Sequence, residues 1–315
     1  MNKNFALIGA AGYIAPRHMK AIKETNNNLI AAFDPYDGIG VLDSYFPESY
    51  FFTEFERFER FVDKWCRNSG KKIDYVSICS PNYLHDSHIR FALRNNAHAI
   101  CEKPIVLNPW NIDQLSVIES ESKKSVFNIL QLRYHSSIIK LKKKIDDELK
   151  KNPSKIYNIE LTYLTSRGNW YMISWKGDQN KSGGIATNIG VHFFDMLTWI
   201  FGDMIDVKIN LNKPTAQAGI LNLKNANIRW FLSIDSKYLP ESAIKKGLKT
   251  YRSIKVNEEK IEFSGGFNEL HTESYKGILV GSGYGLRDAK KSIEIVSRIR
   301  NSKVEKIDDC HYLTK

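Results

Sequence analysis

The sequence predicts an α/β fold in two domains: a doubly wound parallel sheet, followed by an α+β domain with an open, mostly antiparallel sheet. The chain has 315 residues, about twice the usual length of one domain. Apolar strands alternate with amphipathic helices up to about residue 133, as in a parallel sheet covered on both faces. Beyond that point, apolar and polar residues alternate along longer strand-like stretches. We expect the domains to cover residues 1–123 and 124–315.

The first domain shows a regular succession of short elements. Strands are expected at residues 5–9, 28–34, 50–53, 74–80, 97–103 and 126–132. Helices are expected at residues 15–25, 54–66, 83–95 and 109–123. The strand 74–80, DYVSICS, is largely apolar, which is typical of a strand buried on both faces of its sheet.

The second domain has a different pattern. A basic helix is expected at about residues 135–150 and an amphipathic helix at residues 285–301. Strands are expected at residues 155–168, 206–211, 216–223, 226–235, 251–256 and 260–263. No internal repeat and no low-complexity linker separates the two halves, so the domains are expected to follow each other directly.

Composition places the chain among soluble globular proteins, with 42% hydrophobic and 26% charged residues. No apolar run approaches the roughly 18 residues of a membrane-spanning helix, and the N-terminus lacks the layout of a signal peptide. The four cysteines form no CxxC pair, so a reducing cytoplasm fits best.

The net charge of +11 raises nucleic-acid binding as an alternative. However, in the densest basic cluster of the chain, KLKKKIDDELKK, basic residues alternate with acidic ones, as on a solvated helix face.

The first expected strand runs into a turn of small residues. Gly9, Gly12 and Ala15 follow at intervals of three. Compared with the dinucleotide-binding pattern G-x-G-x-x-G/A, the loop departs by one residue or has Ala11 in place of the middle glycine. Small residues let the backbone approach a pyrophosphate, whose charge is held at the N-terminus of the next helix. Asp34 ends the second strand, where a carboxylate binds ribose hydroxyls and repels a 2′-phosphate. The sequence therefore predicts NAD as the cofactor.

Polar side chains follow the fourth and fifth expected strands, in SPNYLHDSHI (80–89) and CEKPI (101–105). In an open α/β sheet, ligands lie outside the carboxyl ends of the strands. A lysine directly after an apolar strand is costly unless a partner satisfies it, so Lys103 is a candidate for chemistry. A lysine that reaches the surface is the alternative. The side chains expected at this edge are Ser80, Asn82, His85, Glu102 and Lys103.

The stretch SGGIATNIGVHFFDMLTWIFG (182–202) is the most informative part of the second half. Asn188, His192 and Asp195 lie at i, i+4 and i+7, on one face of an expected helix. A histidine between an amide and a carboxylate is a candidate base, although a single buried histidine is more often structural. No serine or cysteine has a positioned base, which argues against a hydrolase. The histidines show no metal-ligand spacing, so no metal is expected.

The motifs GAAGYIA, SPNYLH, CEKP and GGIATNIGVHFFD resemble those of the Gfo/Idh/MocA oxidoreductase family over essentially the whole chain. The resemblance implies an N-terminal Rossmann domain, a C-terminal substrate domain and NAD. The family usually carries Asp where this chain has Asn188. That difference removes one possible proton partner and leaves Lys103 and His192 as the chemical pair.

Longer strings, among them LTYLTSRGNWYMISWKGD and TNIGVHFFDML, are similar to the UDP-N-acetylglucosaminuronate 3-dehydrogenases of the WlbA/WbpB type. The resemblance implies oxidation of the 3-hydroxyl of a UDP-linked uronate to a ketone, toward diacetylated aminouronic acids of bacterial surface polysaccharides (O-antigen). It also implies tightly held NAD, recycled by 2-oxoglutarate in some relatives, and a homotetramer. A different anionic sugar as substrate remains the alternative.

The expected mechanism is direct hydride transfer from the sugar to the nicotinamide. His192 takes the hydroxyl proton and Lys103 hydrogen-bonds the same oxygen, or the two exchange roles. Cofactor-binding residues are expected to be Gly9, Ala11, Gly12, Tyr13, Ile14, Asp34, Ser80, Asn82, His85, Glu102, Lys103 and Gln131. Substrate-binding residues are expected to be Arg17, Lys103, Arg133, Arg167, Asn169, Tyr171, Lys176, Asn188 and His192.

Overall fold

The structure is a computed structural model that describes residues 2–67, 71–257, 259–261 and 269–314. The chain divides into two compact units, which are described separately below. The first unit comprises Met1–Gln131 and Asn268–Lys290, and the second comprises Leu132–Phe267 and Lys291–Lys315.

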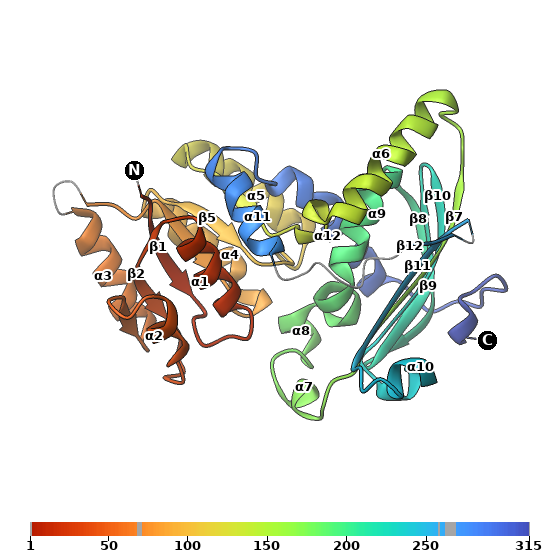
Figure 1. Ribbon diagram of the computed structural model, residues 1–315, viewed down its shortest axis with the longest axis horizontal. Coiled ribbons are helices and arrows are strands. Elements are labelled where there is room, and N and C mark those ends of the chain that lie inside the picture. The colour runs from red at the N-terminus through yellow and green to blue at the C-terminus, as the bar shows by residue number, and fades with distance from the viewer. Residues whose placement is uncertain (1, 68–70, 258, 262–268, 315) are drawn as a thin grey trace. The chain divides into compact units, whose positions relative to one another are not determined.

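The first unit contains a sheet of six parallel strands in the order β3-β2-β1-β4-β5-β6, as expected for a doubly wound fold (Figure 1). Its strands are β1 (Asn4–Ile8), β2 (Asn28–Phe33), β3 (Tyr50–Phe52), β4 (Tyr75–Ile78), β5 (His98–Cys101) and β6 (Val126–Asn128). Its helices are α1 (Ala15–Glu24), α2 (Val41–Tyr45), α3 (Phe55–Arg67), η1 (Asn82–Leu84), α4 (His85–Arg94), α5 (Pro109–Ser122) and α11 (Leu270–Leu279). The strand order reverses at β1 and β4, which fixes where a ligand can approach the sheet edge.

Helix α1 shows why this sequence folds locally as it does. Pro16 stands in its first turn, where a missing N–H costs nothing. Its buried residues recur at helical spacing and form one face against the sheet: Ala15, His18, Met19, Ala21 and Ile22. His18 therefore lies on the buried face of an otherwise apolar stripe, where a polar ring needs hydrogen-bond partners.

Helix α11 was not predicted from the sequence, and it belongs to the first unit although it comes after the second sheet. It packs on α1, with Thr272 donating to Glu24 and Lys20 paired with Glu269. Tyr275 stacks on Phe5 of β1 at 5.9 Å between ring centroids. The chain thus returns to the first sheet near its end, and α12 (Leu286–Asn301) then passes from the first unit into the second.

The domain bounds found in the structure differ from those expected, 1–123 and 124–315. Strand β6 pairs with β5 in the first sheet, so the first unit extends to Gln131. The expected strand at 126–132 ends at Asn128, whose side-chain amide donates to the carbonyl of Cys101. Residues Gln131–Tyr134 form the 3-10 turn η2, so Gln131 and Arg133 do not lie on a strand.

The second unit contains a six-stranded mixed sheet in the order β12-β11-β7-β10-β9-β8. Among the strands that the structure describes, only β7 and β10 pair in parallel, which confirms a mostly antiparallel sheet. Its strands are β7 (Tyr157–Thr165), β8 (Met204–Lys213), β9 (Ala216–Leu223), β10 (Ala226–Ser233), β11 (Thr250–Val256) and β12 (Glu259–Ile261). Its helices are α6 (Ser136–Lys151), α7 (Trp170–Ile173), α8 (Gln179–Ser182), the π turn η3 (Ala186–Gly190), α9 (Val191–Phe201), η4 (Ser236–Tyr238), α10 (Glu241–Ile244) and η5 (Tyr312–Thr314). Residues 262–263 of the last expected strand lie outside the described residues.

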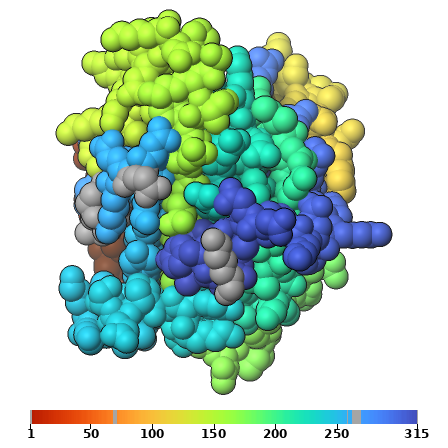
Figure 2. Space-filling view, turned by 90° about the vertical axis from the view of Figure 1, so that its right-hand side faces the viewer, coloured from red at the N-terminus to blue at the C-terminus, as the bar shows by residue number. Residues whose placement is uncertain are grey.

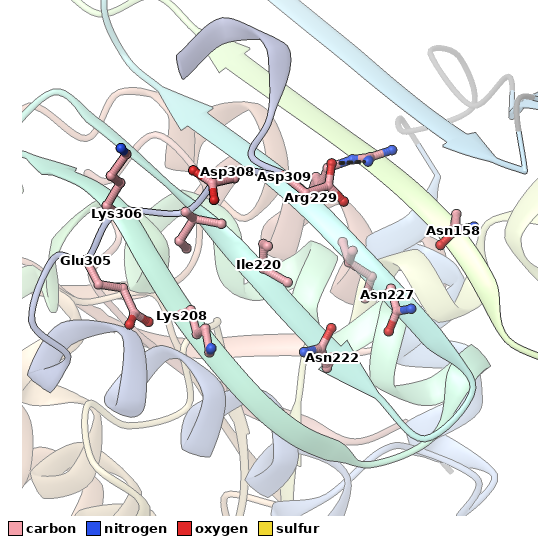
Figure 3. Close-up of a pocket in the computed structure, with 12 residues that line it drawn as sticks. Asn158, Lys208, Ile220, Asn222, Asn227, Arg229, Glu305, Lys306, Asp308 and Asp309 are labelled. Carbon is pink, nitrogen blue, oxygen red and sulfur yellow. Dashed lines mark hydrogen bonds and ion pairs between the residues drawn. The ribbon is translucent and has the colours of Figure 1, made fainter. Parts of the chain in front are cut away.

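The two faces of this sheet are covered differently. Helix α9 packs on one face through aromatic pairs such as Phe194 with Trp230. Residues 302–314 cross the other face, which we call the outer face, and Figure 2 shows this C-terminal segment in dark blue. It is held by a bridge from Val304 to Ile209 and by the Arg229–Asp309 ion pair. Beside the segment lies a polar hollow (Figure 3), lined among others by Asn158, Lys208, Asn222, Asn227, Glu305 and Lys306.

None of the helices in the described part of the chain combines the length and the apolar composition needed to cross a membrane. All four cysteines are free thiols.

His311 makes the attachment of the C-terminal segment sensitive to pH. Its Nε2 lies 2.9 Å from the Thr162 hydroxyl, and burial lowers the pKa of its imidazole to about 4. Because an unfolded histidine titrates at about 6.5, the unfolded chain binds this proton first, so stability is full above pH 6.5 and is lost as the pH falls toward 4. We expect the melting temperature of the wild type to fall more steeply over this range than that of His311→Gln, which carries no ionisable ring. Parallel melting curves of the two proteins against pH would contradict this assignment.

Candidate functional site

The glycine turn lies where β1 ends, at the reversal of the strand order. Gly9 has a φ of +88°, and a Cβ there would lie 2.6 Å from the backbone carbon of Cys79 at the end of β4. Only glycine fits both that conformation and that close approach. The N–H groups of Gly9 and Ala10 both donate to the carbonyl of Phe33, and Gly12 N donates to Gly9 O. The backbone is thus folded tightly ahead of α1, whose N-terminus favours an anion.

Asp34 connects this turn to the end of β2. Its Oδ2 accepts the N–H of Ala11 at 3.0 Å, and its Oδ1 accepts the N–H of Tyr36 at 3.0 Å. An ionised carboxylate offers about four lone-pair positions, so these two bonds leave capacity for two ribose hydroxyls. The negative charge disfavours a 2′-phosphate at the same place. Gly9, Gly12 and Asp34 therefore fit NAD as the sequence predicts.

Other residues of the predicted cofactor site lie around the start of α1. Ile14 is the residue before the helix, and Tyr13 beside it is 89% exposed. Arg17 is half-buried in the first turn of α1. These positions are available to a ligand at the helix N-terminus.

The residues after β4 are more deeply buried than the sequence suggested. The Ser80 hydroxyl lies 2.8 Å from Nδ1 of His88, and Asn82 is buried in η1. The ring of His85 contacts the carbonyl oxygens of Ser80 (2.8 Å) and Pro104 (2.7 Å). Burial lowers the pKa of His85, which is fully enclosed. That His85 binds the cofactor stays a prediction; in the structure its ring contacts one carbonyl after β4 and one after β5.

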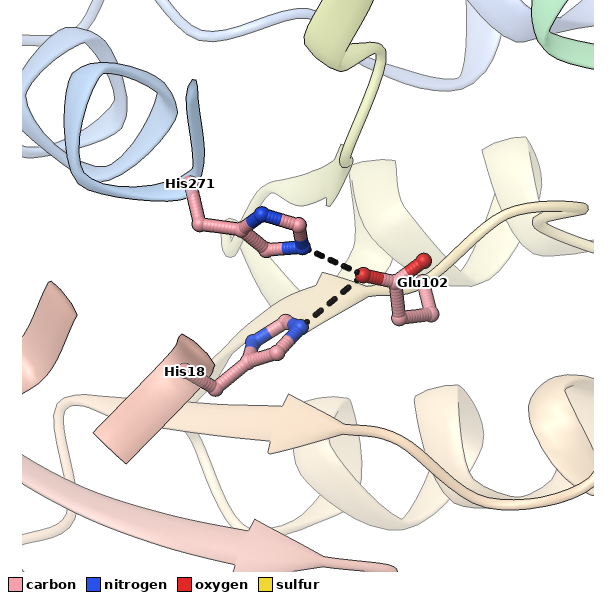
Figure 4. A group of neighbouring side chains, drawn as sticks. All are labelled: His18, Glu102 and His271. Atoms are coloured by element: carbon pink, nitrogen blue, oxygen red, sulfur yellow. Dashed lines mark hydrogen bonds and ion pairs between the residues drawn. The ribbon is translucent and has the colours of Figure 1, made fainter. Parts of the chain in front are cut away.

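Glu102 and Lys103 follow β5, and the Lys103–Pro104 bond is cis. Figure 4 shows the rings of His18 and His271 directed at one oxygen of Glu102, with distances of 3.0 and 2.9 Å from Nε2 to Oε1. The other oxygen accepts the Lys103 N–H at 3.1 Å. That Glu102 binds the cofactor stays a prediction; its carboxylate already accepts hydrogen bonds from groups of its own unit. Lys103 itself is half-buried.

Burial alone would raise the pKa of Glu102, but the hydrogen bonds from His18 and His271 hold that pKa well below its usual value. Burial lowers the pKa of His18, and the adjacent carboxylate opposes this only in part. At neutral pH the cluster therefore holds an ionised carboxylate and a neutral His18.

In the second unit, Asn188 and His192 do not lie on one continuous α-helix. Asn188 lies in the π turn η3 and His192 in the first turn of α9, so the predicted i, i+4, i+7 stripe is interrupted. Asn188 donates to the Tyr171 hydroxyl at 2.6 Å, which brings two predicted substrate residues together. His192 remains half-buried.

Arg133 has a carboxylate partner that the sequence did not reveal. Its Nε and Nη2 donate to the two oxygens of Asp195 at 3.0 and 2.7 Å, and both side chains are buried. That Arg133 binds a substrate anion stays a prediction; one edge of its guanidinium already holds the Asp195 carboxylate. The pair fixes η2 against α9, the helix that carries His192.

The segment after β7 presents cations and aromatic rings. Arg167 and Asn169 are exposed, whereas Tyr171 is buried against Asn188. The ammonium of Lys176 lies 4.3 Å from the ring centroid of Trp175 and 5.6 Å from that of Trp170. Cations held over aromatic rings in this way offer an electrostatic contact to an anionic ligand while their stems stay ordered.

The sequence reasoning missed His271 and Tyr275 as neighbours of the strand-end residues. The available signal was LHTESYKGI, which has the spacing of an amphipathic helix but follows strands of the second sheet. From the sequence, His18 is only a residue just past the glycine turn that could face an anion, since no spacing rule links it to a residue more than 250 positions later.

Family models match both parts of the chain. The Gfo/Idh/MocA model described as "Oxidoreductase family, NAD-binding Rossmann fold" matches residues 3–129. The model described as "Oxidoreductase family, C-terminal alpha/beta domain" matches residues 154–252.

Two solved structures from Thermus thermophilus resemble the whole chain. Both are of the WlbA (WbpB) dehydrogenase, one with NAD and alpha-ketoglutarate and one with NAD and UDP-GlcNAcA. The first is 45% identical and covers 99% of this chain and 100% of its own; the second is 46% identical and covers 99% of each. The TM-score is 0.94 for both.

A more distant curated relative is the glucose-6-phosphate 3-dehydrogenase of Bacillus subtilis. It is 25% identical over 234 residues, which are 68% of this chain and 60% of that protein. The chain therefore matches less than two thirds of the length of this relative.

Asp34 provides the test of the cofactor site. We expect Asp34→Ala to weaken NAD binding about 10-fold to 100-fold, because hydrogen bonds to a charged group contribute about 1.5–3 kcal/mol. It should also narrow the preference for NAD over NADP, since the repelling charge is removed. Titration of protein fluorescence with each nucleotide measures both effects. Asp37→Ala, an exposed acid three residues later, is the control. Equal NAD affinity of Asp34→Ala and the wild type would refute the role.

Proposed function

Since the chain belongs to the Gfo/Idh/MocA oxidoreductase family, we propose that it is an NAD-dependent dehydrogenase that oxidises the 3-hydroxyl of UDP-N-acetyl-D-glucosaminuronic acid to a ketone. One observation carries the proposal: the chain is 46% identical, over 99% of its length, to a dehydrogenase solved with NAD and UDP-GlcNAcA. The product is a precursor suited to diacetylated aminouronic acids of surface polysaccharides. The alternative is a dehydrogenase of the same family that acts on a different anionic sugar.

The residues of the first unit hold the cofactor in this proposal. The glycine turn leaves room for the pyrophosphate at the N-terminus of α1, and Asp34 takes the ribose hydroxyls. When bound, NAD accepts the hydride that leaves C3 of the sugar.

Lys103 and His192 carry the proton chemistry in this proposal. His192 takes the proton of the 3-hydroxyl, and the Lys103 ammonium hydrogen-bonds the same oxygen and stabilises its developing negative charge. The two residues belong to different units, so the assignment rests on residue type and on the family resemblance. A deprotonated Lys103 can serve as the base in place of His192.

An anionic substrate accounts for the cations near the candidate site. A UDP-linked uronate carries a pyrophosphate and a carboxylate, and guanidinium and ammonium groups bind both. Arg17, Arg167 and Lys176 are the cations that we assign to the substrate. Arg133 is assigned to positioning instead, because Asp195 holds it.

Reoxidation of the cofactor is the next part of the proposal. Oxidation of an alcohol by NAD is uphill near neutral pH, so the reduced cofactor must be consumed. The Thermus protein was solved with alpha-ketoglutarate beside NAD. We assign 2-oxoglutarate to this chain as the oxidant: it takes a hydride and a proton and becomes 2-hydroxyglutarate.

The proposal includes a cytoplasmic homotetramer. Free thiols suit a reducing compartment. The exposed part of the outer face, including the polar hollow of Figure 3, is the surface that we assign to subunit contacts.

Other functions have less support: a free polyol as substrate leaves Arg167 and Lys176 without a role, and a non-catalytic NAD sensor leaves Lys103 and His192 without one.

The proposal predicts that NAD is reduced in one round of reaction when the protein is present in stoichiometric amount. Purified protein mixed with NAD and UDP-N-acetylglucosaminuronic acid should show a rise in reduced-nicotinamide absorbance. Addition of 2-oxoglutarate should reverse the rise, because it reoxidises the cofactor. The sugar nucleotide should then be two mass units lighter than the one supplied, because its 3-hydroxyl has become a ketone. No rise, and no mass loss with 2-oxoglutarate present, would refute the substrate and leave the family assignment standing.

The proposed roles of Lys103 and His192 predict that replacing either residue lowers turnover without weakening NAD binding. Lys103→Ala and His192→Ala should each lower turnover about 100-fold or more, the range for loss of an acid–base group. NAD binding should stay within about three-fold of the wild type, because neither change touches the glycine turn. Lys140→Ala, an exposed lysine of α6, is the control for loss of positive charge. Near-normal turnover in either variant would exclude the role assigned to that residue.

A further inference from the structure

We propose that His18, Glu102 and His271 form a buried clamp that positions Lys103 for the reaction. The inference rests on the proposed function, in which the Lys103 ammonium meets the sugar oxygen. It assigns positioning roles to two histidines that lie outside the proposed chemistry. We use the name clamp for these three residues.

The clamp joins three segments that are distant in the sequence. His18 comes from α1, Glu102 follows β5, and His271 comes from α11 (Figure 4). The side chains are almost inaccessible, with exposed fractions of 0% for His18, 6% for Glu102 and 1% for His271. A buried carboxylate is tolerated only where donors surround it, so the geometry commits both rings to Glu102.

The direction of each hydrogen bond follows from the charge of Glu102. An ionised carboxylate only accepts, so Nε2 of both rings must carry a proton. The Nδ1 atom of neutral His18 is then an acceptor, and the Tyr275 hydroxyl lies 2.7 Å from it. Tyr275 in turn lies 2.6 Å from the Ser77 hydroxyl, which can donate to it. The chain from Ser77 through Tyr275 to His18 thus fixes the tautomer of His18.

His271 contributes one hydrogen bond to Glu102, and its ring lies edge-on to that of His18 at 5.2 Å between centroids. Its Nδ1 is buried, and among the described residues no hydrogen-bond partner lies within reach of it. Of its two ring nitrogens, only Nε2 therefore forms a hydrogen bond within the part of the chain that the structure describes. Replacement of His271 therefore removes one donor from Glu102 and breaks no other hydrogen bond of the ring among the described residues.

The connection from the clamp to Lys103 is direct. The second oxygen of Glu102 accepts the backbone N–H of Lys103 at 3.1 Å. On the other side, His85 Nδ1 lies 2.7 Å from the carbonyl of Pro104. The backbone N–H of Lys103 is therefore bound by the clamp, and the carbonyl of the next residue contacts His85. Loss of a donor to Glu102 lets the carboxylate turn and shifts the start of the lysine side chain.

The same three side chains also invite comparison with a metal site. Their ligand atoms lie within 4.8 Å of one another, and two histidines with a carboxylate form a common ligand set. Metal binding would require both Nε2 atoms to lose the protons that now bind Glu102. The hydrogen-bonded form satisfies the carboxylate without an ion, so we assign the cluster to positioning and test the other possibility below.

The first experiment compares His271→Leu, which removes the donor, with His271→Gln, which keeps an N–H at about the same place. A misplacement of about 1 Å in a catalytic group costs about 10²-fold in rate. We expect kcat to fall about 10-fold to 100-fold in His271→Leu and to stay within about three-fold in His271→Gln. The KM for the sugar nucleotide and the Kd for NAD should change by less than about three-fold in both. A merely structural role would lower the melting temperature without this split. Equal kcat in the two variants would overturn the proposal.

The second experiment does not depend on activity. Glu102→Gln offers one oxygen to three N–H donors, so the bond to the Lys103 amide competes with those to the two rings. Hydrogen exchange of residues 101–106 should accelerate about tenfold in Glu102→Gln. Glu119→Gln is the matched control, because Glu119 accepts the Val126 N–H at 2.7 Å in the same unit. Unchanged exchange in Glu102→Gln would overturn the proposal even if the wild type showed no turnover, a result that by itself refutes only the proposed function.

Metal analysis of the purified wild-type protein completes the test. We expect less than about 0.1 equivalent of zinc, iron, manganese, cobalt, nickel or copper. One equivalent that is lost in His271→Leu would overturn the hydrogen-bonded clamp and assign a metal site in its place.

Discussion

A carboxylate buried at a strand end must be surrounded by donors, and the first unit is organised around that requirement at Glu102. The donors come from α1, from α11 and from the next peptide of its own chain. Helix α11 supplies one of these donors, so it lies in the first unit although it follows the strands of the second sheet in the sequence. This explains why the first unit is discontinuous in sequence, and why a polar ring such as His18 is tolerated on the apolar face of α1.

The sequence predicted the parts of the site whose chemistry is local. The glycine turn and Asp34 are separated by about 20 residues, and one strand–helix–strand unit fixes that spacing. The alternation of strands and helices predicted a doubly wound parallel sheet, and alternating polarity predicted a second, mostly antiparallel sheet. These features depend on neighbouring residues, so a single sequence is sufficient to find them.

Contacts between distant segments were not predictable in the same way. The sequence placed Glu102 and His85 after the ends of β5 and β4 and expected Arg133 on a strand that in fact ends at Asn128, but it did not reveal the partners of these residues. Asp195 lies 62 residues after Arg133, and His271 lies 169 residues after Glu102. No periodicity links such pairs, because packing of whole helices decides them. The expected strand 126–132 ends early, at Asn128, for a related reason. The Asn128 side chain donates to the carbonyl of Cys101 in β5, a contact that the sequence does not reveal.

Asp34 and Glu102 show how far burial and position alone can mislead. Both carboxylates follow parallel strands of the same sheet, and both are 6% exposed. Asp34 receives two backbone N–H groups, one on each oxygen, and keeps lone pairs for hydroxyl groups. Glu102 receives two imidazoles on one oxygen and a peptide N–H on the other. The first carboxylate can therefore bind a ligand, whereas the second holds the protein's own backbone, and the difference lies in the donors that each one meets.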